Sequence, residues 1–199
     1  MRRVLNVGGA SKAIPIPAHY QGWDHVLLDV DAGQRPDVVC DARELATLPR
    51  ELYDAVYCSH NLEHYWRHDL PRVLAGFAHV LRAHGFAEVA VPDMKAVFAD
   101  MLRRGLDIDD VLYESDSGAV TVNDVIYGHG RQIAASGKDF YAHKNGFTHS
   151  SLAAALNRAG FAWVFTGSGP YEARALAFKR EPTADQRAAL KLATSQGTT

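Results

Sequence analysis

Short apolar runs with little polar alternation recur along the first half of the chain. Continuous hydrophobicity of this kind is typical of strands that are covered on both faces, as in parallel sheets, and the shortness of the runs favours strands over helices. The pattern therefore predicts five parallel strands, at residues 3–7, 25–29, 37–40, 54–59 and 87–91.

Helical spacing of apolar residues separates and follows the later runs. In residues 69–83, apolar side chains recur every three or four positions, Pro71 lies near the first turn and Gly85 lies past the end. Residues 93–104 repeat this spacing, and Gly105 is expected to end the helix. Strands that alternate with helices predict an α/β fold.

The pattern changes again near the end of the chain. Residues 148–159 have a Thr or Ser cap and a helical spacing, and Gly160 follows them. Two further strands, at 162–167 and 173–179, are joined by a turn that contains Gly and Pro. The complete pattern predicts a doubly wound, mostly parallel seven-stranded sheet of the Rossmann-like kind with a C-terminal antiparallel hairpin.

Residues 106–147 interrupt this alternation, because they are rich in Asp, Gly, Tyr and His and contain few long apolar runs. We expect an insertion with short elements that serves as a substrate-side lid. With 199 residues, 47% of them hydrophobic, the chain is long enough for one domain with a full core. The prediction is a single domain over residues 1–180 and a polar tail over 181–199.

Charge and cysteine content restrict the partners and the compartment. The net charge is −2 and no run of Lys or Arg occurs, which argues against nucleic acid as a partner. No apolar span approaches the roughly 20 residues that a bilayer requires, so no membrane partner is expected. Cys40 and Cys58 each end an apolar run and are expected to be free thiols in a reducing compartment. These features predict a cytoplasmic protein.

Residues 60–64 have the spacing H-x-x-E-H, which one group of zinc peptidases uses. That motif requires both histidines on one face of an established helix, so that two imidazoles reach one ion. Here the motif directly follows a predicted strand, the next helix begins near Asp69, and no further Glu or His stands at a distinctive spacing behind it. The sequence therefore favours a loop and predicts no metal.

Polar and glycine residues follow the predicted strands, at the edge where an open parallel sheet binds its ligands. Any one of these polar or glycine residues, considered alone, is compatible with an ordinary turn or helix cap. An acid about 20 residues after a glycine-rich turn, however, is what holds a ribose in nucleotide-binding sheets. A dinucleotide enzyme would need G-x-G-x-x-G at the start of a helix, and "GGASKAIPIP" does not provide it. The strand-end residues are Gly8, Gly9, Asp29, Asp31, Asp41, Ser59, His60 and Asn61.

The segments around these residues resemble the class I S-adenosylmethionine-dependent methyltransferases, especially the small ones with a type 11-like core, over roughly residues 3–179. The segments that carry the resemblance are "VLNVGG", "LLD", "VVCDARELATLP", "YDAVYCSHNLEHY", "LPRVLAGFAHVLRAHGFAEVAVPDM" and "HKNGFTHSSLAAALNRAGF". In the family an EH pair after the fourth strand occurs without metal, which implies that Glu63 and His64 orient the loop while Ser59 and His60 face the cofactor.

The resemblance implies S-adenosylmethionine as cofactor and a set of residues that bind it. There are departures from the family: Asn6 replaces the acid that usually ends the first strand, and Ala10 stands near the usual third glycine. Pro15 and Pro17 exclude the regular helix that normally follows the turn. The cofactor residues implied are Asn6, Gly8, Gly9, Asp29, Asp41, Ala42 and Ser59.

The function implied is methyl transfer to an oxygen or nitrogen atom of a small-molecule acceptor. Such a displacement needs alignment, and a general base only where the acceptor must lose a proton. The candidate catalytic groups are His60, Tyr127, His129 and His143, with Tyr141 beside them. A non-catalytic or regulatory relative that binds the cofactor is the alternative. The sequence leaves the acceptor's identity open, and it leaves a homodimer open.

Overall fold

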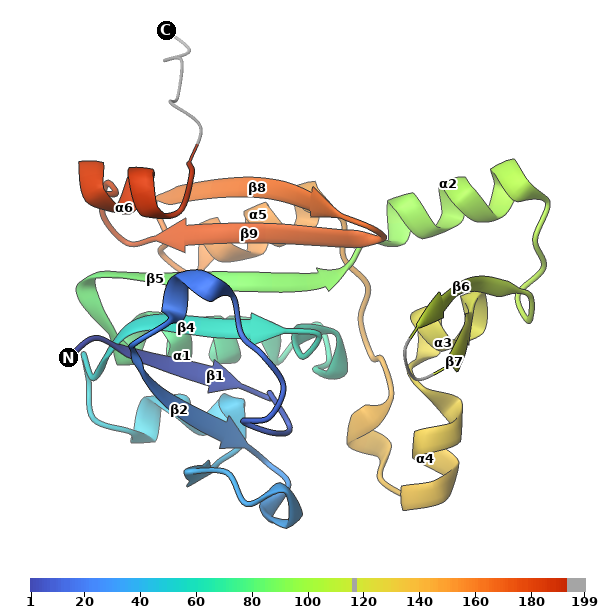
Figure 1. The fold of residues 1–199 in the computed structure, drawn as a ribbon, viewed down its shortest axis with the longest axis horizontal. Coiled ribbons are helices and arrows are strands. Elements are labelled where there is room, and N and C mark those ends of the chain that lie inside the picture. Colours follow the sequence, from blue (N-terminus) through green and yellow to red (C-terminus); the bar gives the residue numbers. More distant parts are fainter. Residues whose placement is uncertain (116–117, 193–199) are drawn as a thin grey trace, which may run out of the picture.

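Figure 1 shows the computed structural model, which describes residues 1–115 and 118–192. A seven-stranded sheet has the order β3-β2-β1-β4-β5-β9-β8, in which β1 to β5 run parallel and β8 and β9 form an antiparallel hairpin. This confirms the predicted mostly parallel sheet with its C-terminal hairpin. The strands are β1 Arg3–Val7, β2 Asp24–Asp29, β3 Val38–Val39, β4 Tyr53–Ser59, β5 Leu81–Pro92, β8 Trp163–Gly169 and β9 Glu172–Phe178.

The boundary between α1 (Leu70–Val80) and β5 differs from the prediction. The helix was expected to reach residue 83, but it ends at Val80 and the strand begins at Leu81. Leu81 pairs with Tyr53 of β4 and is fully buried, so sheet pairing replaces the last predicted helical turn. The register then shifts between Tyr53 and Ala55, which marks a bulge.

The two faces of the sheet are covered differently. In Figure 1, α1 and α5 (His149–Arg158) lie behind the sheet, whereas a short 3-10 helix, η1 (Ala18–Tyr20), and α6 (Ala184–Ala189) lie in front of it. Residues 10–17 contain no regular helix, as the two prolines predicted. Most buried apolar residues belong to the cluster on the α1 and α5 side.

Short 3-10 helices fill the loops after the parallel strands. They are η2 Ala32–Gln34, η3 Ala42–Thr47 and η4 Leu62–His64. Each follows a strand end directly, so residues from β2, β3 and β4 gather at one edge of the sheet. Of the predicted tail, α6 is described and residues 193–199 lie outside the described part of the chain. Within residues 1–115 and 118–192, no helix has the length and apolarity that crossing a membrane requires.

The insertion between β5 and α5 lies beyond the carboxyl ends of the parallel strands (Figure 1). A β-bridge joins Asp93 to Phe147, and the Met94 amide donates to the Phe147 carbonyl over 2.9 Å, so the insertion begins and ends at one place. It has its own apolar cluster, which includes Val97 and Val125. Its elements are α2 Met94–Arg104, β6 Val111–Ser115, β7 Gly118–Thr121, α3 Val122–Tyr127, α4 Gly130–Ser136 and the 3-10 helix η5 Asp139–Tyr141.

Candidate functional site

A cavity of about 1110 Å³ lies between the strand ends and the insertion. Three parts of the chain form its walls: the loops after β1, β2, β3 and β4, the insertion, and the turn between β8 and β9. The volume slightly exceeds the usual range for small-ligand sites, roughly 300–1,000 Å³. Lining residues that matter below are Gly8, Asp29, Asp41, His60, Glu63, His64, His129, Tyr141, His143 and Glu172.

The turn after β1 is held against β2 by a carboxylate. Gly8 has φ +71°, and a Cβ there would lie 2.1 Å from Asn61 Nδ2, so only glycine fits. The Ala10 amide donates to Asp29 Oδ2 over 3.1 Å, and the Asp31 amide donates to Asp29 Oδ1 over 2.9 Å. Asp29 is 8% exposed and lines the cavity, and a carboxylate has about four acceptor sites. Two of these sites remain for a ligand.

The Asn6 side chain is buried against this turn and does not line the cavity. It is 3% exposed, and its Nδ2 lies 3.2 Å from Nε2 of His25 on β2. Burial, the largest effect, lowers the pKa of His25, so its ring is neutral and can accept a hydrogen bond. A Cβ on Gly9 would lie 2.2 Å from Asn6 Nδ2, which shows how closely the turn packs on this side chain. Four of the predicted cofactor residues do not line the cavity in the described part of the chain: Asn6, Gly9, Ala42 and Ser59.

Asp41 begins η3 and combines a structural role with exposure to the cavity. Its Oδ1 accepts from the Arg43 amide over 2.9 Å, and its Oδ2 forms an ion pair with Arg43 Nη2 at 2.6 Å. Burial alone would raise the pKa of Asp41, but the hydrogen bonds from Arg43 outweigh it and lower that pKa. The predicted adenine-side residue Asp41 is therefore charged at neutral pH and lines the cavity, whereas its neighbour Ala42 is buried.

An ion pair joins the insertion to the loop after β2. Lys138 Nζ lies 2.7 Å from Asp31 Oδ2, and this hydrogen bond lowers the pKa of Asp31. Asp31 also accepts from the Gly33 amide over 3.0 Å. The contact links the segment after α4 to the loop after β2.

His60 is a cation in this arrangement. Its Nε2 lies 2.8 Å from Glu172 Oε1, and its Nδ1 lies 3.5 Å from Glu63 Oε1. Burial lowers the pKa of His60, but the hydrogen bond to Glu172 and the nearby negative charges of Glu63 and Glu172 outweigh it and raise the pKa to about 10. The bond from His60 in turn lowers the pKa of Glu172 to about 2. A histidine that is protonated at neutral pH cannot act as a general base. We therefore expect His60 to orient the carboxylates of Glu63 and Glu172 instead.

The other predicted catalytic residues lie at different depths. Tyr127 is 60% exposed and is absent from the described cavity lining, although its carbonyl accepts from the His143 amide over 3.0 Å. His129 precedes α4 and lines the cavity, as does Tyr141. Burial, the largest effect, lowers the pKa of His143, which is neutral near pH 7.

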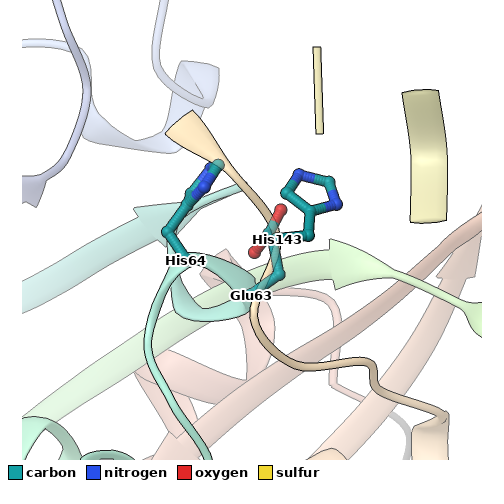
Figure 2. A group of neighbouring side chains, drawn as sticks. All are labelled: Glu63, His64 and His143. Atoms are coloured by element: carbon teal, nitrogen blue, oxygen red, sulfur yellow. The ribbon is translucent and has the colours of Figure 1, made fainter. Parts of the chain in front are cut away.

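Figure 2 shows a cluster that the sequence did not predict, in which the Glu63 carboxylate lies beside the rings of His64 and His143, and the two rings contact each other edge to face with centroids 4.8 Å apart. One ligand atom from each of the three residues lies within 4.8 Å of the others. Glu63 is 1% exposed, and both of its carboxylate oxygens lack a hydrogen-bond partner in the described chain. The H-x-x-E-H spacing pointed to His60 as the companion of His64, but the second ring comes from the far end of the insertion.

Comparisons with known proteins bear on the fold. Residues 19–89 match the family model described as a methyltransferase domain. The chain has a class I methyltransferase fold. This confirms the resemblance drawn from the sequence motifs and supports the prediction of an enzyme that uses S-adenosylmethionine. A search of curated protein sequences finds no significant match.

Three solved structures illustrate the likeness to methyltransferases. A SAM-dependent methyltransferase from Archaeoglobus fulgidus is 16% identical, with 88% of this chain and 85% of that one covered and a TM-score of 0.55. One from Mesorhizobium loti is 15% identical, with 88% and 90% covered and a TM-score of 0.55. The 1,6-didemethyltoxoflavin-N1-methyltransferase of Burkholderia thailandensis, with 1,6-didemethyltoxoflavin and S-adenosylhomocysteine bound, is 18% identical, with 90% and 72% covered and a TM-score of 0.52.

The methyltransferase match begins after the departures from the family pattern. Residues 19–89 include Asp29, Asp41 and the EH pair, but not the turn with Asn6 and Ala10. Ala10 has φ +55°, a left-handed conformation that glycine adopts without strain. The turn thus keeps the backbone path that a third glycine would favour, although the residue has changed.

Proposed function

We propose that this methyltransferase-fold protein transfers a methyl group from S-adenosylmethionine to an oxygen or nitrogen atom of a small molecule. The observation that carries the proposal is the single cavity that has a carboxylate-lined sheet edge on one side and histidines of the insertion on the other. Asp29 and Asp41 represent the first side, and His129 and His143 represent the second.

The sheet edge suits the cofactor. In this proposal, the two acceptor sites that Asp29 keeps free bind the ribose diol of the cofactor. The Gly8 turn lets a ligand approach the backbone closely. Asp41 lies on the adjacent loop and lines the same wall. When it is bound, S-adenosylmethionine supplies a sulfonium methyl group that an aligned nucleophile displaces in line. The chain's own task is to orient both partners and exclude water.

The insertion suits the acceptor. His143 is neutral near pH 7, so it is available to accept a proton if the acceptor must lose one, whereas His60 is already protonated. Lys138 holds the insertion over the cavity through Asp31, which favours an acceptor small enough to be enclosed. The Burkholderia thailandensis neighbour, which is named for N-methylation of a small molecule, supports this class of acceptor.

Isothermal titration with S-adenosylmethionine and S-adenosylhomocysteine tests the cofactor, with NAD as the control nucleotide. We expect one site per chain for each of the first two ligands and none for NAD. A panel of phenols, carboxylic acids, amines and N-heterocycles, assayed by release of S-adenosylhomocysteine, then tests transfer. The proposal fails if the folded protein binds neither S-adenosyl compound at millimolar concentration.

One observation favours the alternative of a non-catalytic or regulatory relative. Asn6 replaces the usual acid and is turned toward His25, so no carboxylate from β1 faces the cofactor's amino-acid end. That alternative expects binding of S-adenosylhomocysteine without product release for every member of the panel. A cytoplasmic location, the absence of nucleic-acid and membrane partners, and the oligomeric state stay predictions from the sequence.

A further inference from the structure

We propose that Glu63, His64 and His143 bind one divalent transition-metal ion, for which Zn²⁺ is the suitable probe. The three side chains converge in Figure 2, and all three line the cavity. Two imidazoles and one carboxylate form a ligand set that zinc uses at sites with an open coordination position. The inference rests on this cluster alone and does not depend on the proposed methyl transfer, in which a metal-bound His143 would no longer accept a proton.

The Glu63 carboxylate is buried without a hydrogen-bond partner in the described chain. A buried carboxylate normally has hydrogen-bond donors around it, because burial of an unpaired charge is strongly unfavourable. Glu63 is 1% exposed, and neither oxygen makes a hydrogen bond in the described chain. The cationic group in ion-pair range is the His60 ring at 3.5 Å, and its Nε2 already points to Glu172. The carboxylate is therefore left with a full set of acceptor sites and one distant positive charge.

Both histidine rings are oriented by backbone carbonyl groups. The Nδ1 of His64 lies 3.2 Å from the Ala142 carbonyl, and the Nδ1 of His143 lies 2.9 Å from the Val125 carbonyl. A carbonyl only accepts, so each Nδ1 carries the proton and each Nε2 keeps its lone pair. Histidines that bind metals typically donate their second ring nitrogen to a backbone carbonyl in this way. The cluster therefore presents three acceptors, and a cation is the ligand that satisfies them together.

Backbone hydrogen bonds fix the two halves of the site to each other. The amides of Lys144 and Asn145 donate to the Glu63 carbonyl over 2.7 Å and 3.1 Å. The backbone of Glu63 and the two residues that follow His143 are thus part of one hydrogen-bonded unit. Side chains held on such a unit lose little further freedom when an ion binds.

The distances require a modest adjustment. Ligand atoms about 2.1 Å from a tetrahedral zinc lie roughly 3.4 Å from one another, whereas the cluster extends to 4.8 Å. The proposal therefore requires the ligand atoms to move closer together by up to about 1.4 Å when the ion binds. His60 is not a ligand in this proposal. The ion would bind Glu63 and His64 of the H-x-x-E-H segment together with His143, which is distant in the sequence. The open coordination position would face the cavity.

The test uses the full chain, freed of any affinity tag and treated with chelator, in a buffer that does not bind metals. Isothermal titration with ZnCl₂ is expected to give one site per chain with a dissociation constant of micromolar or tighter. The variants Glu63→Gln, His64→Gln and His143→Gln are each expected to weaken Zn²⁺ binding at least tenfold. His129→Gln, in the same cavity but outside the cluster, is the matched control and should bind Zn²⁺ as the wild type does.

Spectroscopy keeps the proposal testable if a variant does not fold. X-ray absorption of the wild-type zinc complex should show nitrogen and oxygen ligands near 2.0–2.1 Å and no sulfur near 2.3 Å. Absence of Zn²⁺ binding at 100 µM, or a sulfur ligand, overturns the proposal. So does loss of binding in His60→Gln with retention in His143→Gln, because that result assigns the ion to the H-x-x-E-H motif. Loss of methyl transfer alone would bear on the proposed function and not on this site.

Discussion

Replacement of Asp29 by Asn separates cofactor binding from the folding of the turn. The carboxylate accepts from the Ala10 and Asp31 amides, so Asp29→Ala would remove two backbone hydrogen bonds together with the ligand contacts. Asp29→Asn has nearly the same shape and keeps one carbonyl oxygen as an acceptor. It removes the charge and one acceptor group, which makes the change small enough to interpret.

The magnitude follows from the two acceptor sites that Asp29 leaves for a ribose diol. A hydrogen bond to a charged group contributes roughly 1.5–3 kcal/mol, and a neutral bond is about half as strong. The loss over two bonds is therefore about 1.5–3 kcal/mol, which corresponds to a roughly 10- to 150-fold weaker affinity for S-adenosylhomocysteine. Stability should also fall, by about 1–3 kcal/mol, because the amide group of Asn cannot accept from both backbone amides.

The assay is isothermal titration of S-adenosylhomocysteine at a temperature well below the melting point of the variant. Circular dichroism checks that the variant is folded, and urea denaturation gives the free energy of unfolding. Asp31→Asn is the control, because Asp31 contacts Lys138 and Gly33 instead of the Ala10 turn. A change below threefold is expected for it. If the wild type binds and folded Asp29→Asn binds equally well, the placement of the ribose at the end of β2 is wrong.

Ala10→Gly should raise the free energy of unfolding by up to about 1 kcal/mol, since relief of a left-handed alanine slightly outweighs the entropy of glycine; a loss above 1 kcal/mol in urea denaturation would contradict this. Lys138→Ala should speed amide hydrogen exchange in the insertion above pH 4, and the difference from wild type should vanish at lower pH. The pKa of Asp31 is lowered from its ordinary value of 3.8, so the ion pair is fully present above pH 3.8 and is lost as Asp31 is protonated at lower pH. Equal exchange in the variant and the wild type at pH 7 would refute the contact. His129→Ala should reduce methyl transfer while the cofactor dissociation constant changes less than twofold, and exposed Tyr127→Phe should change neither; weakened cofactor binding in both variants would argue against separate cofactor and acceptor sides.

The sheet could be predicted because its signals are local. Residues 3–7 form β1 as expected, and the left-handed Gly105 ends α2 as its position indicated. The error at the end of α1 has a non-local cause. Leu81 continues the helical apolar spacing, yet its pairing with Tyr53 places it in a strand. Spacing along the sequence cannot report on a partner that lies far away in the chain.

The site was predicted less completely for the same reason. Asp29, Gly8 and His143 do line one cavity, as their positions after strands and in the insertion suggested. The direction in which Asn6 points depends on His25 of the neighbouring strand, which no motif describes. The protonation of His60 depends on Glu172, from the last strand of the sheet. Charge and orientation are set by contacts across the fold, and residue type alone does not reveal them.

The bridge between Asp93 and Phe147 has an evolutionary consequence. Everything between these two residues leaves the sheet and returns to it at adjacent positions, so a longer or shorter segment there would alter loop-closure entropy only slightly. Its apolar cluster is also separate from the main core. If the proposed division holds, this segment could be replaced during evolution and the acceptor changed without redesign of the cofactor edge.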